Sequence, residues 1–178
     1  QNHQKRIQTV APAAKKPWAT GLFYPVWILV MGTVLLSGSL RSTNTGQLTL
    51  TAIDVGQGAS TLVRLPDGKA LLIDGGGFYG QAFDVGAHVV APYLLHEGIT
   101  SLEAVVLTHA HPDHLNGLLY ILEHFKVREI WTNGDLPREE DAQRFVDLAT
   151  RKGIPVYPLS RGSVPFEKSG VKIACLHP

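Results

Sequence analysis

Apolar and polar residues alternate along the first part of the globular region, and turns rich in glycine separate the alternating segments. Residues 48–55 alternate in this way, which predicts a strand with one buried face. Residues 60–65 and 70–74 predict two more strands, and the Pro66-Asp67-Gly68-Lys69 segment between them is typical of a hairpin. Strands that follow each other through such turns favour an antiparallel sheet.

Helical and extended patterns alternate in the remainder of the chain. We expect helices over residues 84–98, 115–125 and 135–153, and strands over residues 104–107, 127–132, 154–157 and 171–176. Asp84 is a suitable N-cap for the first of these helices, and Pro92 should kink it. The alternation of strands and helices predicts an α/β fold.

A long apolar segment precedes all of these elements. No charged residue lies between Lys16 and Arg41, and about 20 apolar residues are enough to span a bilayer core. Four basic residues precede the segment and one follows it, so the positive-inside rule places the N-terminus in the cytoplasm and the globular region outside. A cleaved signal peptide is the competing interpretation, although the segment is longer than such peptides usually are.

The chain therefore divides into four parts. We expect a basic cytoplasmic segment over 1–18, a transmembrane helix over 19–41, a linker over 42–46 and a globular domain over 47–178. The chain begins with Gln rather than Met, and we expect it to be a piece of a longer membrane protein.

Composition and charge exclude two classes of site. The single cysteine, Cys175, rules out an internal disulfide framework and a cysteine-rich zinc site, and we expect it to be buried. The overall charge is +1, but residues 54–178 hold 11 basic and 15 acidic residues, a net charge of −4. The globular domain is thus no basic nucleic-acid clamp, because such clamps need clustered Lys and Arg.

Three of the eight histidines lie within six residues, in the segment His109-Ala110-His111-Pro112-Asp113-His114. Residues two apart in extended backbone point the same way, so His109 and His111 can face one point. Asp113 and His114 follow as the chain turns into a helix, so they can face a second point nearby. Imidazoles with a neighbouring carboxylate suit zinc, manganese or iron better than calcium or magnesium. The pattern favours a metal site over a polar turn that contains accidental histidines.

Two further carboxylates, Asp54 and Asp74, each end a predicted strand and are followed closely by glycine. Glycine permits the close approach of a ligand or another backbone segment, which suits a site. Asp at such positions also commonly bonds to amides of its own turn. Local sequence alone favours this turn role for both residues.

The motif His109-x-His111-x-Asp113-His114, placed after a strand, resembles the metal signature of the metallo-β-lactamase superfamily. The resemblance implies an αββα sandwich, of which this chain would form the N-terminal half. It also implies a hydrolase with two divalent ions, zinc or manganese. His109 and His111 would bind the first ion and Asp113 and His114 the second, with Asp113 and Asp54 also taking catalytic roles.

Further segments resemble one branch of that superfamily, the ComEC-type DNA-uptake proteins of natural competence. These segments are, in order, Asp54-Val55-Gly56-Gln57-Gly58, Leu72-Ile73-Asp74-Gly75-Gly76, Asp84-Val85-Gly86 and Val90-Ala91-Pro92-Tyr93-Leu94. Members of this branch commonly carry an acidic residue where this chain has Ala59, which puts its activity in question. The roles of Asp74, Asp84 and His177 stay open.

The branch implies a nuclease or other phosphodiesterase that acts on single-stranded DNA during transformation. Its partners would be the membrane and other competence proteins. It would lie in the inner (plasma) membrane with several spans in the full protein and with the hydrolase domain in the periplasm or outside the cell. The alternatives are another hydrolase of the same fold and a non-catalytic scaffold that binds DNA.

Overall fold

The computed structural model describes residues 23–39, 46–80, 83–136, 139–163 and 166–176. It contains two units, residues 1–41 and 42–178, which are considered separately below. The expected basic segment, most of the expected linker and His177 lie outside the described residues.

The N-terminal unit contains helix α1 (Phe23–Ser39), which lies within the apolar segment predicted to span a membrane. α1 has 17 residues, and no helix in the described part of the chain is long and apolar enough to cross a bilayer. Residues 19–22 and 40–41 of the predicted span lie outside the described residues.

The second unit is built on a six-stranded mixed sheet in the order β1-β2-β3-β5-β7-β8. Its strands are β1 (Thr49–Ala52), β2 (Thr61–Arg64), β3 (Ala70–Ile73), β5 (Ala104–Leu107), β7 (Ile130–Thr132) and β8 (Val156–Pro158). The first three strands are antiparallel, as the turn pattern predicts, and β3, β5, β7 and β8 are parallel. The carboxyl ends of the parallel strands therefore lie along one edge.

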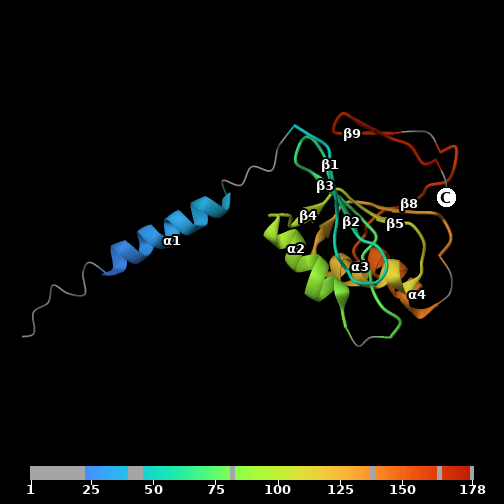
Figure 1. Ribbon diagram of the computed structural model, residues 1–178, viewed down its shortest axis with the longest axis horizontal. Coiled ribbons are helices and arrows are strands. Elements are labelled where there is room, and N and C mark those ends of the chain that lie inside the picture. Colours follow the sequence, from blue (N-terminus) through green and yellow to red (C-terminus); the bar gives the residue numbers. More distant parts are fainter. Residues whose placement is uncertain (1–22, 40–45, 81–82, 137–138, 164–165, 177–178) are drawn as a thin grey trace, which may run out of the picture. The chain divides into compact units, whose positions relative to one another are not determined.

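Helices cover one face of this sheet, as Figure 1 shows. They are the π-helical turn η1 (Gly86–Val90), α2 (Ala91–His96), α3 (Pro112–His124) and α4 (Glu140–Arg151). The main core lies between helices and sheet, and α3 is central to it because it contacts both η1 and α4. Leu62 and Leu72 point into this core from adjacent strands.

The opposite face of the sheet carries a second, smaller core. Val63 and Leu71 belong to it, since neighbouring residues on a strand point to opposite faces. A hairpin of β9 (Phe166–Lys168) and β10 (Val171–Ile173) contributes Val171 and Ile173 to this core. Both faces are thus apolar, which agrees with the half of a sandwich that the sequence predicts.

Several elements differ in detail from the sequence prediction. The helix expected over 84–98 consists of η1 and α2, with Pro92 in the first turn of α2. The wide π turn suits this position because a proline has no N–H for a regular helical bond. The strand expected over 127–132 is divided into the short β6 (Lys126–Val127) and β7. β9 and β4 (Ser101–Leu102), which pairs in parallel with β6, lie outside the predicted strands.

Candidate metal centre

The histidine motif lies between the end of β5 and the start of α3, at the carboxyl edge of the parallel strands. Helix α3 begins at Pro112, three residues earlier than its apolar stripe predicts, so Asp113 and His114 lie in its first turn. His111 has extended backbone and forms the N-cap of the helix. The motif is therefore held between two packed elements.

Three imidazole rings of the motif lie together. The ring centroids of His109 and His111 are 4.7 Å apart, and those of His109 and His114 are 4.0 Å apart. The His109 ring thus contacts both of the other rings. That His109 and His111 face one ion while Asp113 and His114 face a second one nearby stays a prediction.

Asp74 is the buried anchor of this cluster. It follows β3 with a φ of +57° and is 3% exposed. Its carboxylate accepts hydrogen bonds from the amide of Thr108 at 2.9 Å and the hydroxyl of Thr108 at 2.7 Å, and it lies 2.8 Å from Nδ1 of His114. The turn role that local sequence favours is thus replaced by contacts with residues more than thirty positions away.

These contacts determine which ring nitrogens carry protons. A carboxylate only accepts, so Nδ1–H of His114 donates the hydrogen bond to Asp74, which leaves Nε2 for a further partner. The Thr108 hydroxyl donates its hydrogen bond to Asp74, so its oxygen accepts one from Nδ1–H of His109 across 3.1 Å. Nε2 of His109 is then also an acceptor. Asp74 therefore orients two imidazoles, that of His114 directly and that of His109 through Thr108.

The electrostatic surroundings favour the neutral form of His109. Burial lowers the pKa of this imidazole below its ordinary value of 6.5, and the neighbouring His114 and His111 lower it further. Asp74 and Asp113 act in the opposite direction. A neutral imidazole is the form that binds a metal ion.

The glycine-rich loop after β1 packs directly on the motif. Gly58 has a φ of +87°, and a Cβ there would collide with the backbone carbonyl of Asp113. The amide of Ala59 donates to the same carbonyl at 3.3 Å, and its own carbonyl accepts from the amide of Gly76 at 2.8 Å. Ala59 thus acts through its backbone to hold the two loops and α3 together.

The chain can now be compared with known proteins. Residues 53–175 match the family model of the Metallo-beta-lactamase superfamily. This chain belongs to that superfamily. Over 123 residues it is 31% identical to ComE operon protein 3 of Bacillus subtilis (strain 168), which covers 63% of this chain and 16% of that protein. The chain thus spans about a sixth of this relative's length.

A solved structure is also similar, namely the crystal structure of a new diphosphatase from the PhnP family. The TM-score is 0.43 and the sequence identity 21%, over 71% of this chain and 56% of that chain. The superfamily membership inferred from the histidine motif is confirmed by the family match. The mixed α/β fold agrees with it.

Superfamily membership makes divalent metal ions the expected cofactors of the histidine cluster. The donors have suitable chemistry, because Nε2 of His114 lies 3.8 Å from Oδ2 of Asp113 and its other nitrogen is held by Asp74. Within the ranges that the structure describes, however, no three His, Cys, Asp or Glu side chains converge closely enough to hold an ion. The residues fit a divalent metal in chemistry, and their side chains would have to move closer to coordinate it.

Asp54 has a different environment from Asp74. It is exposed, and Oδ1 accepts a hydrogen bond from the amide of Gly56 at 3.1 Å. This is the local turn contact that the sequence favours, and a catalytic role for Asp54 stays a prediction. Asp84 caps the next helix, as expected, by accepting from the amide of Ala87 at 2.9 Å.

A cavity of about 450 Å³ opens beside His109 along the ends of β5 and β7. Thr132, Asn133 and Cys175 are among its lining residues, and Cys175 is only partly buried, against the expectation that it is buried. Sequence patterns alone do not place these residues at the site. For Thr132 and Asn133, their position at the end of the parallel strand β7 is the signal that could have found them, since such strand ends commonly form sites.

Proposed function

We propose that this chain is the metal-binding half of a hydrolase that cleaves phosphodiester bonds of single-stranded DNA in a membrane DNA-uptake protein. The single observation that carries the proposal is the buried Asp74, which orients His114 directly and His109 through Thr108. Superfamily membership supports a hydrolase, and similarity to a ComE operon protein supports the link to DNA uptake.

The side chains that would hold one or two divalent ions, zinc or manganese, are those of His109, His111, Asp113 and His114. Such ions, when bound, lower the pKa of water and stabilise negative charge on a phosphoryl oxygen. Oδ2 of Asp113 would accept a hydrogen bond from the attacking water and orient it towards phosphorus. Asp74 would fix the ring orientation of His114 and its Nδ1–H tautomer, so that Nε2 is the nitrogen that faces the ion.

The location of the protein is part of the same proposal. The uncharged stretch between Lys16 and Arg41, with its excess of basic residues before it, supports an anchor in the inner (plasma) membrane. The hydrolase domain would then lie on the outer side, where incoming DNA arrives. Other competence proteins would be its partners.

A nuclease assay with a matched pair of histidine variants tests the function. The full-length protein should cleave single-stranded DNA with manganese or zinc, and His111→Ala should reduce cleavage to background while lowering the bound metal found by elemental analysis. His96→Ala changes an exposed histidine of α2 and should leave both DNA cleavage and the amount of bound metal unchanged. A protein that binds DNA but never cleaves it would be a scaffold, and cleavage of lactams or thioesters alone would indicate another hydrolase.

A further inference from the structure

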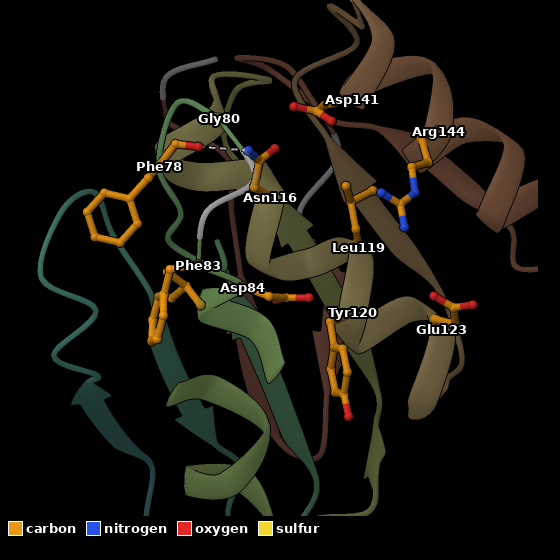
Figure 2. Close-up of a pocket in the computed structure, with 11 residues that line it drawn as sticks. Phe78, Gly80, Phe83, Asp84, Asn116, Leu119, Tyr120, Glu123, Asp141 and Arg144 are labelled. Atoms are coloured by element: carbon orange, nitrogen blue, oxygen red, sulfur yellow. Dashed lines mark hydrogen bonds between the residues drawn. The ribbon is translucent and has the colours of Figure 1, made fainter. Parts of the chain in front are cut away.

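A second concave site lies in the space bordered by η1, α3 and α4 (Figure 2), and Asn116 of its lining follows His114 of the motif by two residues. We call it the α3–α4 pocket. It is lined by Phe78, Gly80, Phe83, Asp84, Val85, Asn116, Leu119, Tyr120, Glu123, Asp141 and Arg144. Its volume of about 190 Å³ is below the roughly 300–1,000 Å³ of sites for drug-sized ligands. The size suits a single small ring system.

The polar lining is rich in hydrogen-bond acceptors. Three carboxylates, those of Asp84, Glu123 and Asp141, face one guanidinium, that of Arg144. Nδ2 of Asn116 donates to the carbonyl of Phe78 at 3.1 Å and so holds the loop that carries this ring against α3, while its Oδ1 has almost no accessible surface. The acceptors that a ligand in the pocket can reach are therefore the carboxylates.

Aromatic rings form the remaining wall. Phe78 and Phe83 meet edge to face with centroids 6.5 Å apart, and Figure 2 shows both rings on the side of the pocket away from Arg144 and Glu123. Phe83 is 48% exposed, although a large apolar side chain is stabilised by burial. The His88 ring stacks on one face of Phe83, with centroids 5.1 Å apart, so a flat ligand would cover the part of the Phe83 ring that stays exposed.

The pocket is joined to the metal centre by tight backbone packing. A Cβ on Gly77 would collide with the carbonyl of Pro112 and lie 2.8 Å from Cβ of Asn116. The Phe78 ring reaches back to the loop that packs on Asp113, since its Cζ would be 3.7 Å from a Cβ on Gly56. The pocket and the histidine motif therefore share the loop after β3 and the first turn of α3.

We propose that the α3–α4 pocket takes one nucleobase of the single-stranded DNA that the neighbouring centre cleaves. This inference rests on the function proposed above. The lining, with three acids and one base, repels a phosphate but accepts a neutral ring. Stacking on an aromatic side chain holds any base, and the acceptor-rich wall favours bases with an exocyclic amino group, which thymine lacks. The site therefore prefers cytosine to thymine.

Binding of three oligonucleotides of equal length and charge to the full-length protein tests the proposal. The probes are a cytosine homopolymer, a thymine homopolymer and an abasic homopolymer, and the readout is fluorescence anisotropy. The wild-type protein should bind them in that order of decreasing affinity. Phe83→Ala should weaken cytosine binding by on the order of tenfold, to near the abasic level. Glu123→Gln should reduce the preference for cytosine over thymine.

Matched controls separate the pocket from general effects. Tyr79→Ala is the control for Phe83→Ala, because it removes a 73% exposed aromatic ring of the same loop that does not line the pocket. Glu140→Gln is the control for Glu123→Gln, because it removes an exposed carboxylate of α4 that does not line the pocket. Both should bind as the wild type does. If DNA is cleaved but the abasic probe binds as tightly as cytosine, or Phe83→Ala changes nothing, the pocket proposal is wrong and the nuclease proposal stands. If no probe is bound or cleaved, both are wrong.

Discussion

At the scale of single residues, Asp74 combines an unusual backbone with a fully engaged carboxylate. Its φ of +57° lies in the left-handed region, which Asp and Asn occupy more readily than other side chains. Both carboxylate oxygens are occupied, one by the Thr108 amide and the other by the Thr108 hydroxyl and His114. An Asp therefore suits this position both because it tolerates the positive φ and because its two carboxylate oxygens accept all three hydrogen bonds.

Asp74→Asn should weaken divalent metal binding by about 10- to 100-fold, as expected when a group that orients a metal ligand is changed. Asn keeps the shape of Asp and its tolerance of the left-handed region, so the change isolates the lost charge and acceptor. Titration calorimetry with zinc and manganese measures the effect. Asp54→Asn is the matched control and should bind metal normally, because the hydrogen bond of Asp54 is local.

A DNA cleavage assay on Asp54→Asn and Asp74→Asn separates a catalytic role from a role in metal binding. Loss of DNA cleavage in Asp54→Asn at unchanged metal affinity would support the predicted catalytic role of Asp54. Unchanged metal affinity in Asp74→Asn would contradict the anchoring role argued for Asp74.

At the scale of elements, helix α3 approaches the loop after β3 more closely than side chains would allow. A Cβ on Gly117 would collide with the carbonyl of Gly75, and the Gly117 amide donates to the carbonyl of Gly76 at 2.9 Å. The Gly75 amide in turn donates to the carbonyl of His114 at 2.7 Å. This contact brings Asp74 and His114 within reach of each other.

Gly117→Ala should therefore lower the free energy of unfolding by about 1–3 kcal/mol, the usual cost of overpacking a close contact. The gain in helix propensity from Ala is smaller than this cost. Urea denaturation measures the difference. Glu123→Ala, at an exposed position of the same helix, should stay within about 0.5 kcal/mol of the wild type. Equal stability of the two variants would show that the backbones can separate without cost.

At the scale of the whole domain, ion pairs hold the β9–β10 hairpin to the second face of the sheet. Nζ of Lys168 lies 2.8 Å from Glu129 and 3.5 Å from Glu103. The Ser169 hydroxyl donates to Asp67 at 2.6 Å. The hydrogen bond with Lys69, and after it the bond with Ser169, lowers the pKa of Asp67 to about 2. The hairpin is thus tied to three separate parts of the sheet layer.

Lys168→Gln should loosen the hairpin and increase amide hydrogen exchange of residues 168–173 severalfold, at a cost of about 1 kcal/mol or less. The hydrogen bond and charge of Glu129 raise the pKa of Lys168 above 10.5 in the folded state. The ion pairs therefore contribute fully below pH 10.5, and their contribution is lost as the pH rises through the higher folded value. Lys172→Gln, which changes an exposed lysine of β10, is the control. Its amide hydrogen exchange at neutral pH should match that of the wild type.

The parts of the fold that local sequence predicts well are those with a strong period or a strong turn. The alternation in residues 48–55, the apolar run 104–107 and the stripe of α3 all correspond to observed elements. β9 was missed because three residues carry too little pattern, and the early start of α3 at Pro112 was missed because its first turn holds polar ligands instead of apolar residues.

The sequence by itself determined the class of this protein, because the ligand types and their spacing in the histidine motif are local and lie between recognisable strand and helix patterns. The tertiary structure decided which carboxylates serve the cluster. Asp54 and Asp74 have similar local sequences, but only the strand next to β5 brings its terminal carboxylate to Thr108 and His114. That choice depends on the order of strands in the sheet, a long-range property set by burial of apolar faces rather than by any short segment.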